Sequence, residues 1–290
     1  MFEVTFLGTS GSTPTVERSM PALAVKYESS LLLWDCGEGT QRQMMKYKVG
    51  YGSVDAIFIT HPHLDHYLGL FGLLETLRLS PCPRKLKAFV PSGLDIGERY
   101  GFVESSRIRN GEILRNNDFS VSAYRVKHCK DAHGLVFQEN DRVKFHEEKA
   151  HSLGLQGMLF REIQQKGKVK VGGKEIRLED VSWVKPGRKI VYSGDCLPDE
   201  NTIEAAKGAD LLIHEATFDN SRKEEADERM HSTAENAAQI AKKAGVKKLV
   251  LTHISPRYSD TADAEELLRQ ATDVFPETEL ACDGMKIVMR

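Results

Sequence analysis

The sequence predicts an α/β (α+β) protein in which helices cover β-sheets, and three observations lead to this prediction. Apolar or alternating runs typical of strands dominate the first third of the chain, and such runs alternate with amphipathic helical patterns towards its end. A hydrophobic content of 40% with 28% charged residues suits a soluble globular protein. No internal repeat or low-complexity linker divides the 290 residues. This mixture favours sheets with helices packed on their faces.

Strands and one helix are predicted in the first part of the chain. The strand segments alternate in polarity or form short apolar runs, and they are residues 2–8, 22–27, 30–35 and 54–60. The last of them, VDAIFIT, is rich in β-branched residues and stops at Thr60. From Asp65, DHYLGLFGLLETLRL has apolar residues at helical spacing, which predicts a helix that ends before SPCPR.

Strands and helices alternate in the second part. Strands are predicted at residues 119–126, 189–194, 210–216 and 247–255, and helices at residues 201–208, 233–245 and 263–275. Between about 140 and 188 the chain is rich in Lys and Gly and shows no steady period. We therefore expect a single domain over residues 1–290 that carries an inserted basic arm at about 140–188.

The composition says more about the cellular compartment of the protein than about its function. No apolar run approaches the roughly 18 residues that suggest a membrane span, and the N-terminus lacks the basic and apolar regions of a secretory signal. The cysteines are odd in number and scattered: Cys36, Cys82, Cys129, Cys196 and Cys282. This usage favours a reducing cytoplasm. The net charge of −2 gives no global argument for nucleic acid, so such a partner would need a local basic surface.

The stretch ITHPHLDH is the strongest sign of chemistry in the sequence. His61 and His63 are two residues apart, so an extended backbone points both to one side, and Asp65 and His66 follow where the helix begins. Neutral imidazoles suit zinc, and a carboxylate offsets its charge. Further donors follow other apolar strands, as a metal site at the carboxyl ends of strands requires: His128, Asp195 and His253. The alternative, a His-rich polar loop, does not account for these additional donors.

Together these stretches resemble a known family. THPHLDH, with a later His, the Asp of YSGDC and the His of LTHIS, resembles the metallo-β-lactamase superfamily. Within it, FLGTSGSTPTVERSMPALAV, DCGEGTQRQMM, HEATF and HST resemble the ribonuclease Z family of tRNA 3′-processing endonucleases, in its short form. THPHLDH identifies only the superfamily, whereas DCGEGTQRQ together with HEATF and HST is more specific. The resemblance spans nearly the whole chain.

The resemblance implies a fold and an activity. The fold is an αββα four-layer sandwich in which two mixed β-sheets face each other and the metals lie at one edge. The activity is that of a zinc-dependent endoribonuclease that removes the 3′ trailer from precursor tRNA and leaves a 3′-hydroxyl on the tRNA. The family's short form works as a homodimer, in which the arm of one subunit presents tRNA to the site of the other.

The resemblance also implies a ligand set for two Zn²⁺ per chain, or for other divalent ions such as Mn²⁺. In it, His61, His63 and His128 bind one ion, Asp65, His66 and His253 bind the second, and Asp195 bridges the two. Asp65 is also expected among the catalytic residues. The family usually has Thr where this chain has Cys196, and a thiolate there would compete with Asp195 for metal. Adjacent side chains of extended backbone point to opposite faces, which favours a packed thiol at Cys196.

HEATF and HST carry the predicted proton donor. The resemblance implies that His231 protonates the leaving ribose oxygen and that Glu215 orients His231 and raises its pKa. The residues alone also indicate a helix start at HSTAENAA, with Ser232 or Thr233 as the cap. Both interpretations can hold, because a cap would fix His231 in place. For Glu215, a polar residue at a strand end is the alternative.

Two further segments are candidates for contact with RNA. The glycines of DCGEGTQRQMM form either a tight turn or a set of amides for phosphate, and Arg42 and Lys46 share a face of the helix that follows. In the family, an insertion between the third-motif His and the bridging Asp forms an arm that grips the tRNA elbow, and residues 140–188 occupy that interval. Its candidate phosphate contacts are Lys144, Lys149, Arg161, Lys166, Lys168 and Lys170. LGLQGMLF lacks the prolines often found in the family arm, and a solvated hairpin is the alternative.

Two rival functions account for parts of the pattern. A small-molecule hydrolase of the same superfamily would act on an ester or a cyclic phosphodiester, but HEATF, HST and the Lys-rich insertion argue against it. An RNA-binding protein without turnover would be expected to lack a metal ligand, whereas this sequence has all seven.

Overall fold

The chain forms two compact units. The computed structural model describes residues 2–80, 84–94, 96–258 and 261–289, so Cys82 lies outside the described residues. The larger unit comprises Met1–Arg115, Val121–Phe137 and Lys189–Arg290, and the smaller comprises Asn116–Ser120 and Gln138–Arg188. All of residues 140–188, the predicted insertion, lie in the smaller unit.

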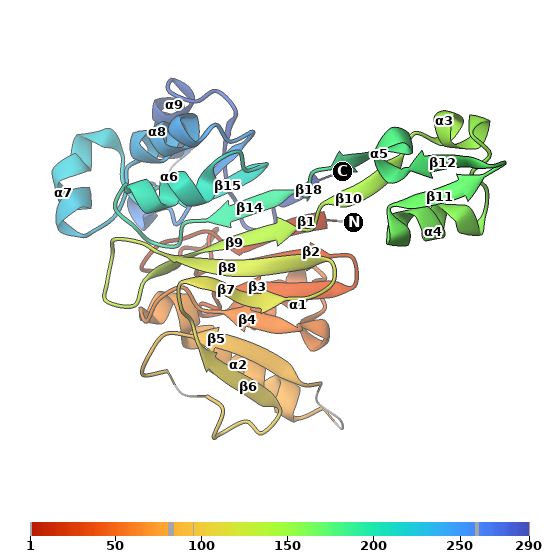
Figure 1. Cartoon of the computed structure of the whole chain (residues 1–290). Coiled ribbons are helices and arrows are strands. Elements are labelled where there is room, and N and C mark those ends of the chain that lie inside the picture. Colours follow the sequence, from red (N-terminus) through yellow and green to blue (C-terminus); the bar gives the residue numbers. More distant parts are fainter. Residues whose placement is uncertain (1, 81–83, 95, 259–260, 290) are drawn as a thin grey trace. The chain divides into compact units, whose positions relative to one another are not determined.

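Within the described residues, the larger unit is built on two seven-stranded sheets (Figure 1). The first has the order β18-β1-β2-β3-β4-β5-β6, with β1 Phe2–Gly8, β2 Ala22–Tyr27, β3 Ser30–Trp34, β4 Ala56–Phe58, β5 Leu86–Val90, β6 Val103–Arg107 and β18 Lys286–Met289. The second has the order β17-β16-β15-β14-β9-β8-β7, with β7 Gly111–Arg115, β8 Phe119–Arg125, β9 His133–Glu139, β14 Lys189–Tyr192, β15 Leu211–Glu215, β16 Leu249–Thr252 and β17 Thr278–Leu280. Strands β3 to β6 and β14 to β17 run parallel within their sheets, so their carboxyl ends collect at one edge of each sheet.

The two sheets face each other through aromatic side chains, and helices cover their outer faces (Figure 1). The ring centroids of Phe2 and Phe137 are 4.6 Å apart, and Trp34 stacks on Tyr192 at 6.1 Å, which joins strands of opposite sheets. The helices of the larger unit are α1 Thr40–Lys46 and α2 Leu64–Arg78 on the first sheet, and α6 Glu200–Ala206, α8 Ala234–Ala244 and α9 Thr261–Thr272 on the second. Shorter helices are η1 Tyr51–Ser53, η2 Asn220–Arg222, α7 Lys223–Glu228 and η3 Pro256–Tyr258. The predicted αββα four-layer sandwich is confirmed.

The smaller unit has a core of its own. Its elements are β10 Arg142–Phe145, α3 Glu147–Ser152, α4 Met158–Lys166, β11 Lys168–Val171, β12 Lys174–Arg177, α5 Leu178–Val181 and β13 Ser182–Lys185. The buried apolar residues are Ala150, Leu155, Ile163, Val169, Ile176 and Val181. Strands β10 and β13 pair antiparallel, as do β11 and β12. Elements this short show no steady period in the sequence, so none of them was predicted.

Strand β4 covers Ala56–Phe58 and is shorter than the predicted strand at residues 54–60. The end of this strand positions the histidine stretch that follows it. The backbone N–H of Ile59 still bonds to the carbonyl of Phe89, but the N–H of Thr60 bonds to the side chain of Asp35 instead of to a strand. The chain therefore leaves the sheet at Thr60, directly before the histidine stretch. Elsewhere, the strands observed at residues 2–8 and 22–27 have the same bounds as the predicted ones. No helix in the described part of the chain has the length and apolar character needed to cross a membrane.

Candidate metal centre

All seven predicted ligands come together where strands of both sheets end. Four lie on the turn from β4 into α2, and the others follow β8, β14 and β16. One group is His61, His63, His128 and Asp195, and the second is Asp65, His66, Asp195 and His253. Within each group the candidate ligand atoms lie within 4.8 Å of one another. Asp195 belongs to both groups, the position that a bridging ligand requires.

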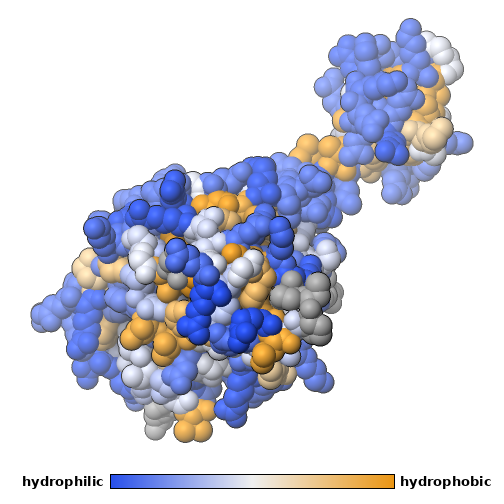
Figure 2. Space-filling model, turned by 90° about the horizontal axis from the view of Figure 1, so that it is seen from below, coloured by the Kyte–Doolittle hydropathy of each residue, from blue (hydrophilic) through white to orange (hydrophobic). Residues whose placement is uncertain are grey.

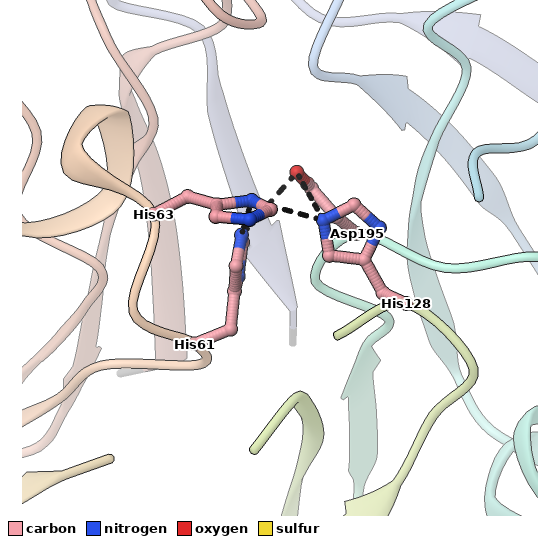
Figure 3. A group of neighbouring side chains, drawn as sticks. All are labelled: His61, His63, His128 and Asp195. Atoms are coloured by element: carbon pink, nitrogen blue, oxygen red, sulfur yellow. Dashed lines mark hydrogen bonds and ion pairs between the residues drawn. The ribbon is translucent and has the colours of Figure 1, made fainter. Parts of the chain in front are cut away.

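The first group has the spacing of ligands around one ion (Figure 3). His63 Nδ1 lies 3.0 Å from His61 Nε2 and 3.1 Å from His128 Nε2. Asp195 Oδ2 lies 3.6 Å from His61 Nε2 and 3.8 Å from His128 Nε2. Ligands held tetrahedrally at the usual zinc–nitrogen length are about 3.3 Å apart, so these donors fit a zinc-type ion.

The second group surrounds the same carboxylate. His66 Nε2 and His253 Nε2 each lie 3.2 Å from Asp195 Oδ2, and Asp65 Oδ2 lies 3.7 Å and 3.5 Å from these nitrogens. Asp195 Oδ1 is buried and has no hydrogen-bond partner among the described residues. Burial would raise the pKa of Asp195, but the neighbouring His253 and His66 hold it well below its ordinary value. A buried, ionised carboxylate with an unpaired oxygen fits a donor set that binds cations.

Hydrogen bonds outside the second group fix which imidazole nitrogens face inward. Thr217 Oγ1 donates to Glu215, so it accepts from Nδ1–H of His253 at 2.9 Å. Nδ1–H of His66 donates to Asp35 at 2.8 Å. With Nδ1 as the donor, the neutral form of each ring turns an Nε2 lone pair inward, and these two atoms are 3.3 Å apart. Two lone pairs this close repel each other unless a cation lies beside them, which is the arrangement of metal-binding histidines.

The first group is oriented in the same way. Nδ1–H of His128 donates to the backbone carbonyl of Met230 at 2.8 Å, and Nδ1 of His61 lies 3.1 Å from Oγ1 of Thr60. Thr60 Oγ1 itself donates to Asp35, so it accepts from His61. Burial is the main cause that holds the pKa of His61 well below its ordinary value. The ring is therefore neutral and ready to bind metal.

Asp35 supports the site and was missed by the sequence analysis. The side chain is buried: Oδ1 accepts from the N–H of Thr60 at 2.8 Å, and Oδ2 accepts from His66 and, at 3.0 Å, from the hydroxyl of Tyr192. Asp35 has a φ of 56°, a conformation that costs free energy and recurs at functional sites. The signal in the sequence was an acidic residue directly after the apolar run SLLLW. It was instead grouped with the glycine turn that follows.

Close packing accounts for one glycine of that turn. A Cβ on Gly37 would lie 2.3 Å from the backbone carbonyl of Asp65, so only glycine lets the turn approach α2. Arg42 and Lys46, on the following helix, line a cavity of about 290 Å³ together with Glu17, Glu38 and Asp283. This mixed charge does not favour an anion, and phosphate contact by DCGEGTQRQ stays a prediction.

His231 and Glu215 form a buried ion pair beside the metal ligands. Nδ1 of His231 lies 2.7 Å from Oε1 of Glu215, which also accepts from the N–H of Cys196 at 2.9 Å. Burial would lower the pKa of His231, but the Glu215 carboxylate raises it to about 9. Burial would likewise raise the pKa of Glu215, and the charge of His231 holds it below its ordinary value. Thr233 caps α8 by accepting from the N–H of Asn236, so the predicted cap is confirmed, and the role of His231 as an acid stays a prediction.

Cys196 points away from the metal ligands. The thiol is buried in a small cluster with Val126 and Ala132, and Sγ lies 3.7 Å from Nε2 of His214. Burial raises the pKa of this thiol well above its ordinary value, so it stays protonated. A protonated, packed thiol is not a competitor for Asp195.

Two of the predicted catalytic residues, Asp65 and His231, line one cavity of about 690 Å³ in the larger unit, whereas Glu215 is buried behind His231. Its lining includes residues of both ligand groups together with His231, Phe218, Arg229 and Arg257. Metal ligands and a hydrogen-bonded histidine therefore face the same space, where a phosphodiester can meet both.

Comparisons with known proteins agree with this geometry. The family model described as Beta-lactamase superfamily domain matches residues 31–254. A ribonuclease Z of Archaeoglobus fulgidus is 43% identical over 99% of this chain and 97% of its own, and one of Myxococcus xanthus is 41% identical over 99% and 97%. The crystal structure of human tRNase Z, short form, covers 99% of both chains with a TM-score of 0.66 at 27% identity. The metallo-β-lactamase fold protein YhfI of Bacillus subtilis covers 99% of this chain and 100% of its own with a TM-score of 0.73, a likeness of fold at 19% identity.

Proposed function

Because the chain belongs to the ribonuclease Z family of the metallo-β-lactamase superfamily, we propose that it cuts precursor tRNA after the discriminator nucleotide. The cut removes the 3′ trailer and leaves a 3′-hydroxyl on the tRNA. The observation that carries the proposal is one cavity lined both by converging candidate metal ligands and by His231, which is hydrogen-bonded to Glu215 behind it. Phosphodiester hydrolysis needs both an activated nucleophile and a proton for the leaving oxygen.

Two Zn²⁺, or other divalent ions such as Mn²⁺, would be held by the two ligand groups. His61, His63 and His128 would hold the first, Asp65, His66 and His253 the second, and Asp195 both. When bound, such ions supply Lewis acidity towards the phosphate and a nucleophilic water near neutral pH. Asp65 accepts a hydrogen bond from the N–H of Ser12 at 3.1 Å, which fixes the direction of its carboxylate. These residues would fix the positions of the ions and would thereby limit where the scissile phosphate can bind.

His231 would supply the proton. Nδ1–H donates to Glu215, so Nε2–H is the donor left for the leaving ribose oxygen. The N–H groups of Cys196 and Thr217 hold the Glu215 carboxylate, at 2.9 Å and 3.1 Å. Ser232 Oγ donates to the carbonyl of Cys196, which ties the loop of His231 to the loop of Asp195. These contacts keep the acid at a fixed position relative to the ligands.

The test of the function is incubation with precursor tRNA labelled at its 5′ end, with and without a chelator. We expect a single product that ends in a 3′-hydroxyl at the discriminator nucleotide, and its loss in chelator. Hydrolysis of small esters without any cut in the precursor would instead favour the small-molecule hydrolase.

The smaller unit would bind the RNA by charge. Its residues 138–188 carry eleven Lys and Arg against eight Asp and Glu, in a chain with a net charge of −2. On the face seen in Figure 2, hydrophilic residues predominate beside a smaller apolar area. Lys166 and Lys168 are exposed and paired only at the surface, with Glu162 and Glu175. A phosphate replaces such partners at little cost.

Changing Lys166, Lys168 and Lys170 to Glu is expected to weaken precursor binding and to flatten its dependence on salt. Each lost phosphate contact lowers the slope of log affinity against log salt by about one. Hydrolysis of bis(p-nitrophenyl) phosphate is expected to persist, because the metal ligands lie in the larger unit. The matched control changes Lys207, Lys242 and Lys243, exposed residues of the larger unit, to Glu. Equal loss of binding in both triple variants would contradict a specific role for the smaller unit.

We also propose that the protein works as a homodimer in the cytoplasm, as the resemblance to the family's short form implies. Light scattering of the purified full chain is expected to give twice the mass of 32.5 kDa. A monomer that cleaves precursor tRNA at the full rate would exclude a requirement for the dimer.

A further inference from the structure

The cavity of the metal ligands has a positively charged rim on the side of His231. Among the described residues that line it, the side chains with permanent positive charge are Arg229 and Arg257. The carboxylates of the lining are Asp65 and Asp195, which the two ligand groups use. With cations bound there, the two arginines face no free carboxylate inside the cavity.

Both arginines are anchored from outside by one acidic residue, Glu225 of α7. Arg257 donates to both oxygens of Glu225, at 3.0 Å and 3.2 Å, and lies 5.1 Å over the ring of Phe218. Arg229 reaches Glu225 through Nε at 3.1 Å, and Arg222 reaches it at 3.0 Å. A single carboxylate thus faces three guanidinium groups. Because three guanidinium groups share one carboxylate, the cluster has N–H donors left for a further anion.

Arg229 is the more available of the two arginines that line the cavity. Its side chain is 66% exposed, against 34% for Arg257, which is held on two sides. A guanidinium with one exposed ion pair can turn to a phosphate at little cost, and Glu225 then remains satisfied by Arg257. Arg229 can therefore turn its guanidinium towards the cavity that it lines.

The backbone places Arg229 next to the proton donor. Met230 separates it from His231, and Met230 has a φ of 61° with its carbonyl bonded to His128. The N–H of His231 also bonds to the carbonyl of Ala226 at 2.8 Å. These contacts fix the segment, so Arg229 and His231 belong to the same side of the cavity.

If His231 protonates the leaving oxygen, the nucleotide that carries this oxygen lies on the same side of the cavity. The leaving oxygen is the 3′-oxygen of the nucleotide that stays on the tRNA, and His231 protonates it. The next phosphate on that side is the 5′-phosphate of the same nucleotide. We propose that Arg229 binds this 5′-phosphate, one phosphate upstream of the cut.

The assignment rests on the proposed function and adds a basis for selecting polynucleotides. A small ester has no second phosphate, and a cyclic phosphodiester has only the phosphate that reacts, so neither gains from Arg229. An RNA strand has the second phosphate and is bound at two points. Contact at the second point orients the strand with its leaving oxygen towards His231.

The test combines the variant Arg229→Gln with a precursor in which this single 5′-phosphate is a neutral methylphosphonate. With the natural precursor, we expect Arg229→Gln to lower kcat/KM about tenfold, mainly through KM, as for one charge-assisted hydrogen bond. With the methylphosphonate precursor, wild-type protein should lose a similar factor, and Arg229→Gln should add no further loss. The matched control is Arg222→Gln, which also loses an ion pair with Glu225 but lies outside the described lining of the cavity. It should cut both precursors at the wild-type rates.

The possible outcomes separate this assignment from the function on which it rests. If Arg229→Gln has the same deficit with both precursors, or none with either, the phosphate contact is wrong while the function stands. If wild-type protein cuts neither precursor, both are wrong. Metal content and thermal unfolding of Arg229→Gln should equal those of wild type, and a drop in either would assign the loss to the structure of the loop instead.

Discussion

Replacing His231 with alanine is expected to slow precursor-tRNA cleavage by about 10²–10⁴-fold, the usual contribution of a general acid. The ribose alkoxide is a poor leaving group and needs the proton. The p-nitrophenolate ion is stable near neutral pH, so hydrolysis of bis(p-nitrophenyl) phosphate should change far less. The measurement is the ratio of the two rate losses at matched metal content, and a ratio near one would exclude the acid role.

Thr233→Ala is the matched control for this variant, because Thr233 caps the helix that follows His231. Loss of a cap costs about 1 kcal/mol of stability. We expect it to lower the unfolding temperature and to leave the ratio of the two rates unchanged. Glu215→Gln should resemble His231→Ala in sparing the activated ester, since an amide orients the ring of His231 without favouring its charged form.

Replacing His63 with alanine is expected to lower the metal content by about one ion per chain. It should also reduce cleavage more than 100-fold, beyond the range typical of residues that only support ligands. His63 joins His61 and His128 in the first group and is itself exposed, so its removal leaves no buried cavity. Elemental analysis of wild-type protein should give close to two zinc-type ions per chain.

The control for His63 is His146→Ala, an exposed histidine of the smaller unit that belongs to neither ligand group. It should retain the full metal content and activity. Fewer than half an ion per chain in wild type, even after reconstitution with zinc, would count decisively against the site.

The sequence was most informative where chemistry follows a strand. The donors at His128, Asp195 and His253 were found because each lies at the carboxyl end of an apolar run that predicts a strand. The parallel strands β14 and β16 bring the last two of these ends to one edge of the second sheet. Strict alternation along extended backbone likewise predicted that Cys196 packs away from Asp195, as its buried cluster with Val126 shows. These inferences need only local geometry.

Features that depend on pairing between distant segments could not be predicted. Asp35 accepts hydrogen bonds from His66 and Thr60 only because β3 and β4 pair in parallel. Neither segment alone predicts this pairing register. The cluster around Glu225 depends on how α7 and the loop after β16 meet. The insertion that forms the smaller unit was predicted, but its helices and strands were not, because elements of four to nine residues are too short to show a period.

The wide separation of the ligands along the chain has a consequence for biosynthesis. His66 and His253, whose nitrogens face each other at 3.3 Å, are 187 positions apart. A nascent chain exposes THPHLDH long before the ribosome has made His253, and any ion caught by that turn is held without its remaining donors. Such an ion exchanges freely until the last parallel strands are added. Firm retention of metal is therefore a late step of maturation, and it marks the completion of the whole larger unit.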